Sequence, residues 1–175
     1  MRPGGHRWPL ERSTEMSATF TLRGRKVVGG CFEGEALVTH DRISGWGGID
    51  PRSGTVIETR HELKGISFAG KVLVFPGAKG SSGWSSQFHV ARLAGVAPGA
   101  MLFNEMTAKM GLGAVVVHAP AMTDFNEDPL NRIRTGDWVR VDADAGTVEV
   151  IPRQSRTDLS TQPQPPGLER TRNPS

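Results

Sequence analysis

The chain has 175 residues, of which 37% are hydrophobic, 22 are glycine and 12 are proline, and this fits one domain with polar ends better than two domains. Its formal net charge is +3, but residues 21–152 carry equal numbers of basic and acidic side chains, so the excess lies in the two ends and we expect no nucleic-acid partner. No stretch approaches the roughly 18 consecutive apolar residues of a membrane span, which excludes a transmembrane protein.

The two ends of the chain differ in composition from its centre. Residues 1–19 and 153–175 lack a periodic apolar pattern, so we predict a disordered N-terminal arm, a folded domain over residues 20–152 and a disordered C-terminal tail. The first residues contain no apolar segment typical of a secretory signal, and the single cysteine, Cys31, excludes a disulfide within the chain. Both observations favour a cytoplasmic location, and we expect Cys31 to be a small buried residue.

Short strands separated by glycines are predicted from Phe20 onward. The segments 20–22 and 26–28 flank a glycine, and residues 36–39 and 55–58 are short β-prone runs. Residues 71–75 are continuously apolar and end at Pro76-Gly77. Continuous apolarity favours a strand that is buried on both faces, as in a parallel sheet.

The next elements alternate between helix and strand. Residues 84–94 place apolar side chains on one helical face and end at Gly95, and residues 99–103 form a second buried strand. A short helix is expected over residues 105–110, followed by a third buried strand over residues 114–117. This order predicts a βαβαβ unit with a small parallel sheet.

The last part of the domain has a different period. Residues 135–142 alternate between apolar and polar side chains, and a turn over residues 143–146 leads into residues 147–151. The pattern predicts an antiparallel hairpin. Together with the parallel part, it predicts an α/β fold of three β/β/α layers, with a small parallel sheet and an antiparallel β layer.

The segment from Pro76 to Ser86 is the most informative one for chemistry. It joins the end of a buried strand to the start of a helix, where unpaired N–H groups and the helix dipole favour an anion. Gly83 is followed by Trp84, so the segment matches neither a P-loop nor a Gly-x-Ser-x-Gly nucleophile elbow. The alternative is that Ser82 or Ser85 acts as an ordinary helix N-cap.

Several pieces of the chain, in this order, resemble one family. The matching pieces are residues 34–38, the Gly45-Trp46-Gly47-Gly48-Ile49-Asp50-Pro51 stretch, His61 before Gly65, residues 70–74, Gly80-Ser81-Ser82 with Ser85, and Ala97-Pro98. They are similar to the small subunit, or swivelling domain, of the aconitase X family, over about residues 21–151.

The resemblance implies a heteromeric hydro-lyase. In this family a large subunit carries an iron–sulfur centre, and the small domain closes over its active site. The first serine of the Gly-Ser-Ser stretch acts as the base, a role that maps onto Ser81. Known family activities include the dehydration of 5-phosphomevalonate and of cis-3-hydroxy-L-proline, so the resemblance implies a small anionic hydroxy acid as substrate.

The chemistry of dehydration agrees with a divided active site. A serine hydroxyl is a poor base unless oriented N–H donors stabilise its alkoxide, and a strand-to-helix loop supplies such donors. Expelling the hydroxyl needs a Lewis acid, which a chain with one cysteine cannot hold, so we expect no cofactor in this chain and a heterodimer or larger complex with a large subunit. Trp84 departs from the small or apolar residue usual after the two serines and faces either the pocket or the core.

Other residues are candidates for substrate binding, and each has a structural alternative. Trp46 lines the cleft or fills a glycine-rich corner, and His61 donates a proton or bonds to the backbone. Lys79 pairs with an anionic substrate or is solvated, and Asn104-Glu105 contacts the site or caps a helix. The substrate-binding candidates are therefore Gly80, Ser82, Ser85, Lys79, Trp46 and His61.

A function of another class stays open beside the enzyme. The same domain could be a non-catalytic swivelling domain that binds an anionic ligand or a partner protein. A stand-alone enzyme would need a complete acid and base set, which this sequence does not display.

Overall fold

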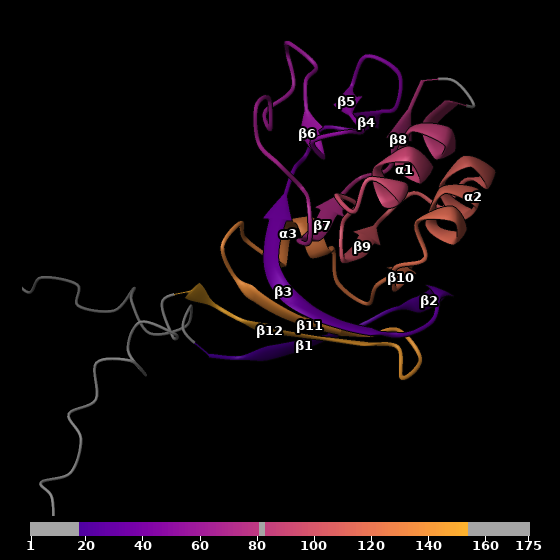
Figure 1. The fold of residues 1–175 in the computed structure, drawn as a ribbon. Helices are drawn as coiled ribbons and strands as arrows, with labels where there is room; N and C mark the ends of the chain where they lie inside the picture. The colour runs from indigo at the N-terminus through magenta and orange to yellow at the C-terminus, as the bar shows by residue number, and fades with distance from the viewer. Residues whose placement is uncertain (1–17, 81–82, 154–175) are drawn as a thin grey trace, which may run out of the picture.

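The computed structural model describes residues 18–80 and 83–153 (Figure 1). Eight strands form one sheet in the order β1-β12-β11-β3-β7-β9-β10-β2, and two small two-stranded sheets pair β4 with β8 and β5 with β6. The elements are β1 (Phe20–Arg23), β2 (Arg25–Val28), β3 (Cys31–Val38), β4 (Ile43–Ser44), β5 (Ile49–Asp50), β6 (Thr55–Val56), β7 (Val72–Phe75), β8 (Ala78–Lys79), α1 (Gly83–Leu93), β9 (Ala100–Phe103), α2 (Ala108–Val117), β10 (Ala121–Thr123), α3 (Pro129–Arg132), β11 (Trp138–Asp142) and β12 (Thr147–Ile151).

Strands β7 and β9 are buried on both faces, as their continuous apolar sequences predicted. β3, β7, β9 and β10 run parallel, and alternate residues of β7 and β9 enter two different cores. Leu73 and Phe75 pack toward α1 and α2, whereas Val72 and Val74 pack toward the antiparallel strands. Figure 1 shows the two helices on one side of these strands and the curved antiparallel strands on the other, so the three β/β/α layers are confirmed.

The antiparallel layer is joined to the parallel strands by β3. Its first half pairs with β11 and its second half pairs in parallel with β7. The hairpin of β11 and β12 has the predicted alternation, with Val139, Val141, Val148 and Val150 buried. β1 extends this layer on the far side of β12.

The helix predicted over residues 105–110 and the strand predicted over 114–117 are both wrong. A single helix, α2, covers Ala108–Val117, and the third parallel strand is β10. Thr107 caps α2 by accepting a hydrogen bond from Met110 N at 3.3 Å, and His118 ends it in a left-handed conformation. The β-branched residues at the end of α2 favour a strand locally, but the cap and the packing against α1 prevail.

The prediction that Cys31 is buried is also wrong, because its side chain is exposed at the start of β3. Residues of β3 alternate between solvent and interior, and Cys31 shares the solvent face with Glu33 and Glu35. Of the predicted arms, only residues 18, 19 and 153 belong to the described part of the chain. No helix within that part is long and apolar enough to cross a bilayer.

Candidate functional site

The candidate site lies where β7 ends and α1 begins, as the sequence predicted. β7 is followed by Pro76-Gly77 and by β8, which pairs in parallel with β4 outside the main sheet. Gly80 comes next with a φ of +84°, a conformation that favours glycine, and α1 starts at Gly83. The predicted base, Ser81, and its neighbour Ser82 lie outside the described residues.

A glycine-rich turn packs against the start of α1. A Cβ on Gly45 would lie 2.6 Å from Trp84 Cα, and a Cβ on Gly83 would overlap the indole nitrogen of Trp46. A Cβ on Gly80 would lie 3.2 Å from Ser44 Oγ. These close approaches explain why glycine occupies the three positions, and they bring β4, the 45–48 turn and the first residue of α1 together around residues 80–83.

The two tryptophans of this region have opposite environments. Trp46 is 67% exposed beside Gly83, so it does not fill a buried corner. Trp84 is fully buried among Phe75 and Phe88, so its larger side chain faces the core rather than the pocket. Trp46 is therefore the tryptophan that is open to a ligand near the start of α1.

Two lysines are associated with Gly80, Lys79 as its neighbour in the chain and Lys109 through a hydrogen bond. Lys79 Nζ lies 2.5 Å from Glu58 Oε1, so this lysine is ion-paired rather than simply solvated. Lys109 Nζ, from the first turn of α2, donates to the carbonyl oxygen of Gly80 at 2.5 Å. Within residues 18–80 and 83–153 no carboxylate forms an ion pair with Lys109, so it leaves a positive charge beside the turn.

The first turn of α1 adds to this positive environment. It contains no acidic residue, and its N-terminal N–H groups and dipole therefore face no neutralising carboxylate from α1 itself. Ser85, one of the predicted binding residues, lies in this turn and is buried. The arrangement can stabilise an anion or a developing oxyanion next to Gly80.

The loop that follows β6 carries two buried polar atoms for which no hydrogen-bond partner is found among the described residues. His61 is 5% exposed, and its Nδ1 accepts a hydrogen bond from Leu63 N at 3.1 Å. In the neutral imidazole the proton is therefore on Nε2. Both this atom and Glu58 Oε2 are buried without a hydrogen-bond partner in the part of the chain that the structure describes. Burying such a group without a partner costs about 1–3 kcal/mol, so these two atoms are candidates for contact with a ligand.

The backbone of this loop is tied to the glycine-rich turn. Ile57 N and Glu58 N both donate to the carbonyl oxygen of Gly48, at 2.8 and 3.3 Å. The structure therefore brings Trp46, Lys79, Gly80 and Ser85 to one region. His61 shares a loop with Glu58, but no direct contact between His61 and the other predicted residues is observed in the described part.

A pair that the sequence did not suggest lies at the ends of β9 and β4. Arg42 Nε donates to both oxygens of Glu105, at 2.9 and 3.0 Å, and these hydrogen bonds hold the pKa of Glu105 below its ordinary value. The suggestion that Asn104-Glu105 caps a helix is wrong, because Thr107 caps α2. Asn104 instead donates to Asp128 at 2.9 Å.

No sequence motif marked Glu58 or Arg42. Lys109 did carry a signal, because it is the one charged residue of an otherwise apolar stretch, 108–117. The contact of Lys109 with Gly80 forms only because one continuous helix covers this stretch, whereas the sequence predicted a helix and a separate strand there.

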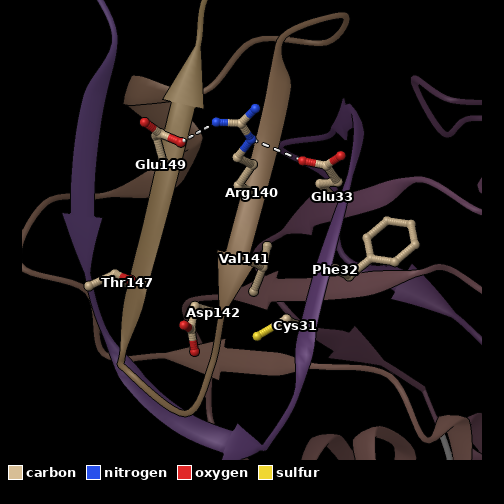
Figure 2. A pocket seen from close by; sticks show the side chains of 8 residues that line it. All are labelled: Cys31, Phe32, Glu33, Arg140, Val141, Asp142, Thr147 and Glu149. Carbon is tan, nitrogen blue, oxygen red and sulfur yellow. Dashed lines mark hydrogen bonds and ion pairs between the residues drawn. The ribbon is translucent and has the colours of Figure 1, made fainter.

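A depression of about 480 Å³ lies elsewhere, on the outer face of the antiparallel layer (Figure 2). It contains none of the predicted site residues. Arg140 in it is hydrogen-bonded to both Glu33 and Glu149, at 2.9 and 3.1 Å. Partial desolvation of the exposed Cys31 thiol, together with the nearby Asp142 carboxylate, raises the pKa of this thiol. Arg140 is already paired with two carboxylates, and the raised pKa of Cys31 disfavours its thiolate, so this face is a poor site for an anion or a nucleophile.

Comparison with known proteins finds similarity to the members of one family. A family model described as "Aconitase X swivel domain" matches residues 21–150. Proteins named phosphomevalonate dehydratase small subunit are 40% identical over 129 residues in Methanocella arvoryzae (74% of this chain, 98% of that protein) and 37% identical over 138 residues in Methanosarcina acetivorans (78% and 96%). The chain is also similar to one in the crystal structure of Thermococcus kodakaraensis aconitase X in its holo-form, with 38% sequence identity and a TM-score of 0.70. The alignment covers 74% of this chain and 97% of that chain.

Proposed function

Since the chain belongs to the aconitase X swivel-domain family, we propose that it is the small subunit of a hydro-lyase that dehydrates 5-phosphomevalonate together with a large subunit. The relatives that carry the name of this enzyme's small subunit align over nearly their whole length. The observation that carries the proposal is the turn at Gly80, which leads from the buried strand β7 and from β8 to the start of α1 and accepts a hydrogen bond from Lys109 directly before Ser81 in the chain.

In this proposal Ser81 removes the proton from the carbon beside the substrate carboxylate. A serine can act as a base only where its alkoxide is stabilised. Lys109 beside Gly80 and the acid-free first turn of α1 support such stabilisation, since both place positive charge next to the position of Ser81 in the chain.

The same region is proposed to bind the substrate. Trp46 offers an exposed indole beside Gly83, and Lys79 offers an ammonium that Glu58 holds in place. His61 supplies an Nε2–H of a buried imidazole that has no hydrogen-bond partner within residues 18–80 and 83–153. The proposed binding set is Gly80, Ser82, Ser85, Lys79, Trp46 and His61.

This chain's own residues do not fit an iron–sulfur centre. The sequence has one cysteine, and the described residues contain no group of three His, Cys, Asp or Glu side chains that could hold a metal ion. The proposal therefore places the iron–sulfur cluster in the large subunit, and the departure of the substrate hydroxyl is assigned to that subunit.

The charge around Gly80 favours phosphomevalonate over cis-3-hydroxy-L-proline. Phosphomevalonate carries a phosphate and a carboxylate, whereas hydroxyproline carries one carboxylate and a cationic amine. Lys109 has no ion-pair partner among the described residues, and the first turn of α1 contains no acidic residue. This positive environment suits the more anionic substrate.

The test is reconstitution of the chain with a purified large subunit. We expect dehydration of 5-phosphomevalonate only when both chains are present, and a loss of several orders of magnitude in Ser81→Ala with assembly intact. Ser82→Ala serves as the matched variant and should lose only a ligand hydrogen bond, about 1–3 kcal/mol. Turnover by the isolated chain would overturn the need for a large subunit. Turnover of hydroxyproline but not of 5-phosphomevalonate would overturn the proposed substrate, and full activity of Ser81→Ala would overturn the role of Ser81 as the base.

A further inference from the structure

Helix α2 has apolar side chains on two opposite faces. Its inner face, Met110, Gly113, Ala114 and Val117, packs against the sheet and α1. On the other side, Leu112 is 56% exposed and Val115 is 55% exposed, and Ala108, one turn before Leu112, is also exposed. These three residues recur at i, i+4 and i+7 and form one stripe, which we name the α2 face.

A helix at the surface of a domain normally presents polar residues to water. α1 does so in part, since Ser86, His89 and Arg92 accompany its exposed apolar residues. α2 has one charged residue in ten, Lys109, and its ammonium is engaged with the Gly80 carbonyl. The α2 face therefore has the pattern of a helix that is covered on both sides.

We propose that the large subunit covers the α2 face, an inference that rests on the proposed function. Lys109 follows Ala108 directly and touches Gly80, so the α2 face begins beside the turn that precedes the proposed base. Along the axis of α2, Leu112 and Val115 lie only about 5 and 9 Å from Lys109. A large subunit that brings its reactive centre to this turn therefore reaches the α2 face as well, and apolar side chains on it would match Leu112 and Val115.

A second copy of this chain is the competing occupant. Two copies paired through their α2 faces would each cover the region of Gly80, because the face and the turn are contiguous. The large subunit could then not approach the turn, and the dimer would have no access to substrate there. The geometry thus favours the large subunit over self-association.

The experiment compares Leu112→Gln and Val115→Glu with the parent chain. Both changes introduce residues that are compatible with a helix, and both side chains are more than half exposed. Ile66→Gln is the matched control, because Ile66 is an apolar residue of similar exposure, 45%, in a loop outside α2. Affinity for the purified large subunit is measured by calorimetry, the melting temperature by differential scanning, and the oligomeric state of the free chain by sedimentation.

We expect each α2 variant to bind the large subunit about tenfold or more weakly, with an unchanged melting temperature, and Ile66→Gln to bind like the parent. Saturating large subunit should restore parent turnover on 5-phosphomevalonate in both α2 variants. If both variants bind the large subunit like the parent and the complex is active, the large subunit does not cover the α2 face, and the proposed function still stands. Self-association of the parent that is lost in Leu112→Gln would assign the face to a second copy, and a parent that binds no large subunit would overturn the proposed function itself.

Discussion

Trp84 Nε1 donates a hydrogen bond of 3.0 Å to the carbonyl oxygen of Ile43, and this contact joins the first turn of α1 to strand β4. The indole is fully buried and stacks on Phe88 with a ring-centroid distance of 4.2 Å. β4 in turn pairs with β8, which leads into Gly80. One buried side chain therefore fixes the helix start relative to the strand that delivers the turn.

Trp84→Phe should destabilise the domain by about 1–3 kcal/mol, because the Ile43 carbonyl loses its donor inside the core and the smaller ring leaves space. The measurement is the free energy of unfolding from urea titration. Trp46→Phe is the control and should change stability by no more than about 0.5 kcal/mol, since this side chain is largely exposed. Equal losses in the two variants would contradict this account of Trp84.

Two glycines of α2 should respond in opposite directions to alanine. A Cβ at Gly113 would overlap the Trp84 ring, which is fully buried and cannot move aside, so Gly113→Ala should lower the melting temperature. At Gly111 the nearest atom is Cε of Met106, at 2.9 Å and at the end of a flexible side chain. Gly111→Ala should therefore keep most of the helix-propensity gain of about 1 kcal/mol. A stabilised Gly113→Ala would show that the Trp84 ring is not packed as described.

Lys109→Met should lower turnover without lowering the melting temperature. A cation in the first turn of a helix opposes the helix dipole, so its removal should leave the melting temperature unchanged or slightly higher. Turnover of the reconstituted complex should fall about tenfold or more, because the Gly80 carbonyl loses its charged donor and the turn loses a positive charge. Lys64→Met, in an exposed loop position, is the matched control and should keep parent turnover. A Lys109→Met complex with parent activity would remove Lys109 from the site.

The sequence predicted the elements whose periodicity is local. β7, β9, α1 and the β11–β12 hairpin appear close to their predicted positions, because a continuous apolar run, a helical stripe and a period of two each follow from neighbouring residues. α2 was missed because residues 114–117 have the composition of a strand, and the packing of Gly113 on Trp84 that favours the helix cannot be seen in the sequence. That packing is a tertiary contact, whereas the Thr107 cap is a local signal that the prediction did not use.

The candidate site was likewise predictable only where its signals are local. The position of the Gly-Ser-Ser stretch between a strand and a helix was predictable from turn and strand signals. The contacts of Lys79 with Glu58 and of Lys109 with Gly80 join residues 21 and 29 positions apart, and no local pattern reports such pairs.

The Arg42–Glu105 pair should make stability depend on pH in the acid range. Hydrogen bonding to Arg42 lowers the pKa of Glu105 in the folded chain, so the pair stabilises the fold above the ordinary glutamate pKa. This contribution is lost as the pH falls through the lowered folded value. In Arg42→Met the pKa of Glu105 returns toward its ordinary value, so stability should fall less steeply between about pH 5 and pH 3 than in the parent.

The measurement for this pair is the urea midpoint at several pH values for the parent, Arg42→Met, Glu105→Gln and the double variant. The double-variant cycle isolates the pair from the other carboxylates with lowered pKa values, Asp50, Glu62 and Asp144, which titrate in all four proteins. Both side chains are partly exposed, so 0.5 M salt should reduce the coupling. A coupling free energy that stayed constant from pH 7 to pH 3 would show that the charge on Glu105 does not stabilise this end of β9.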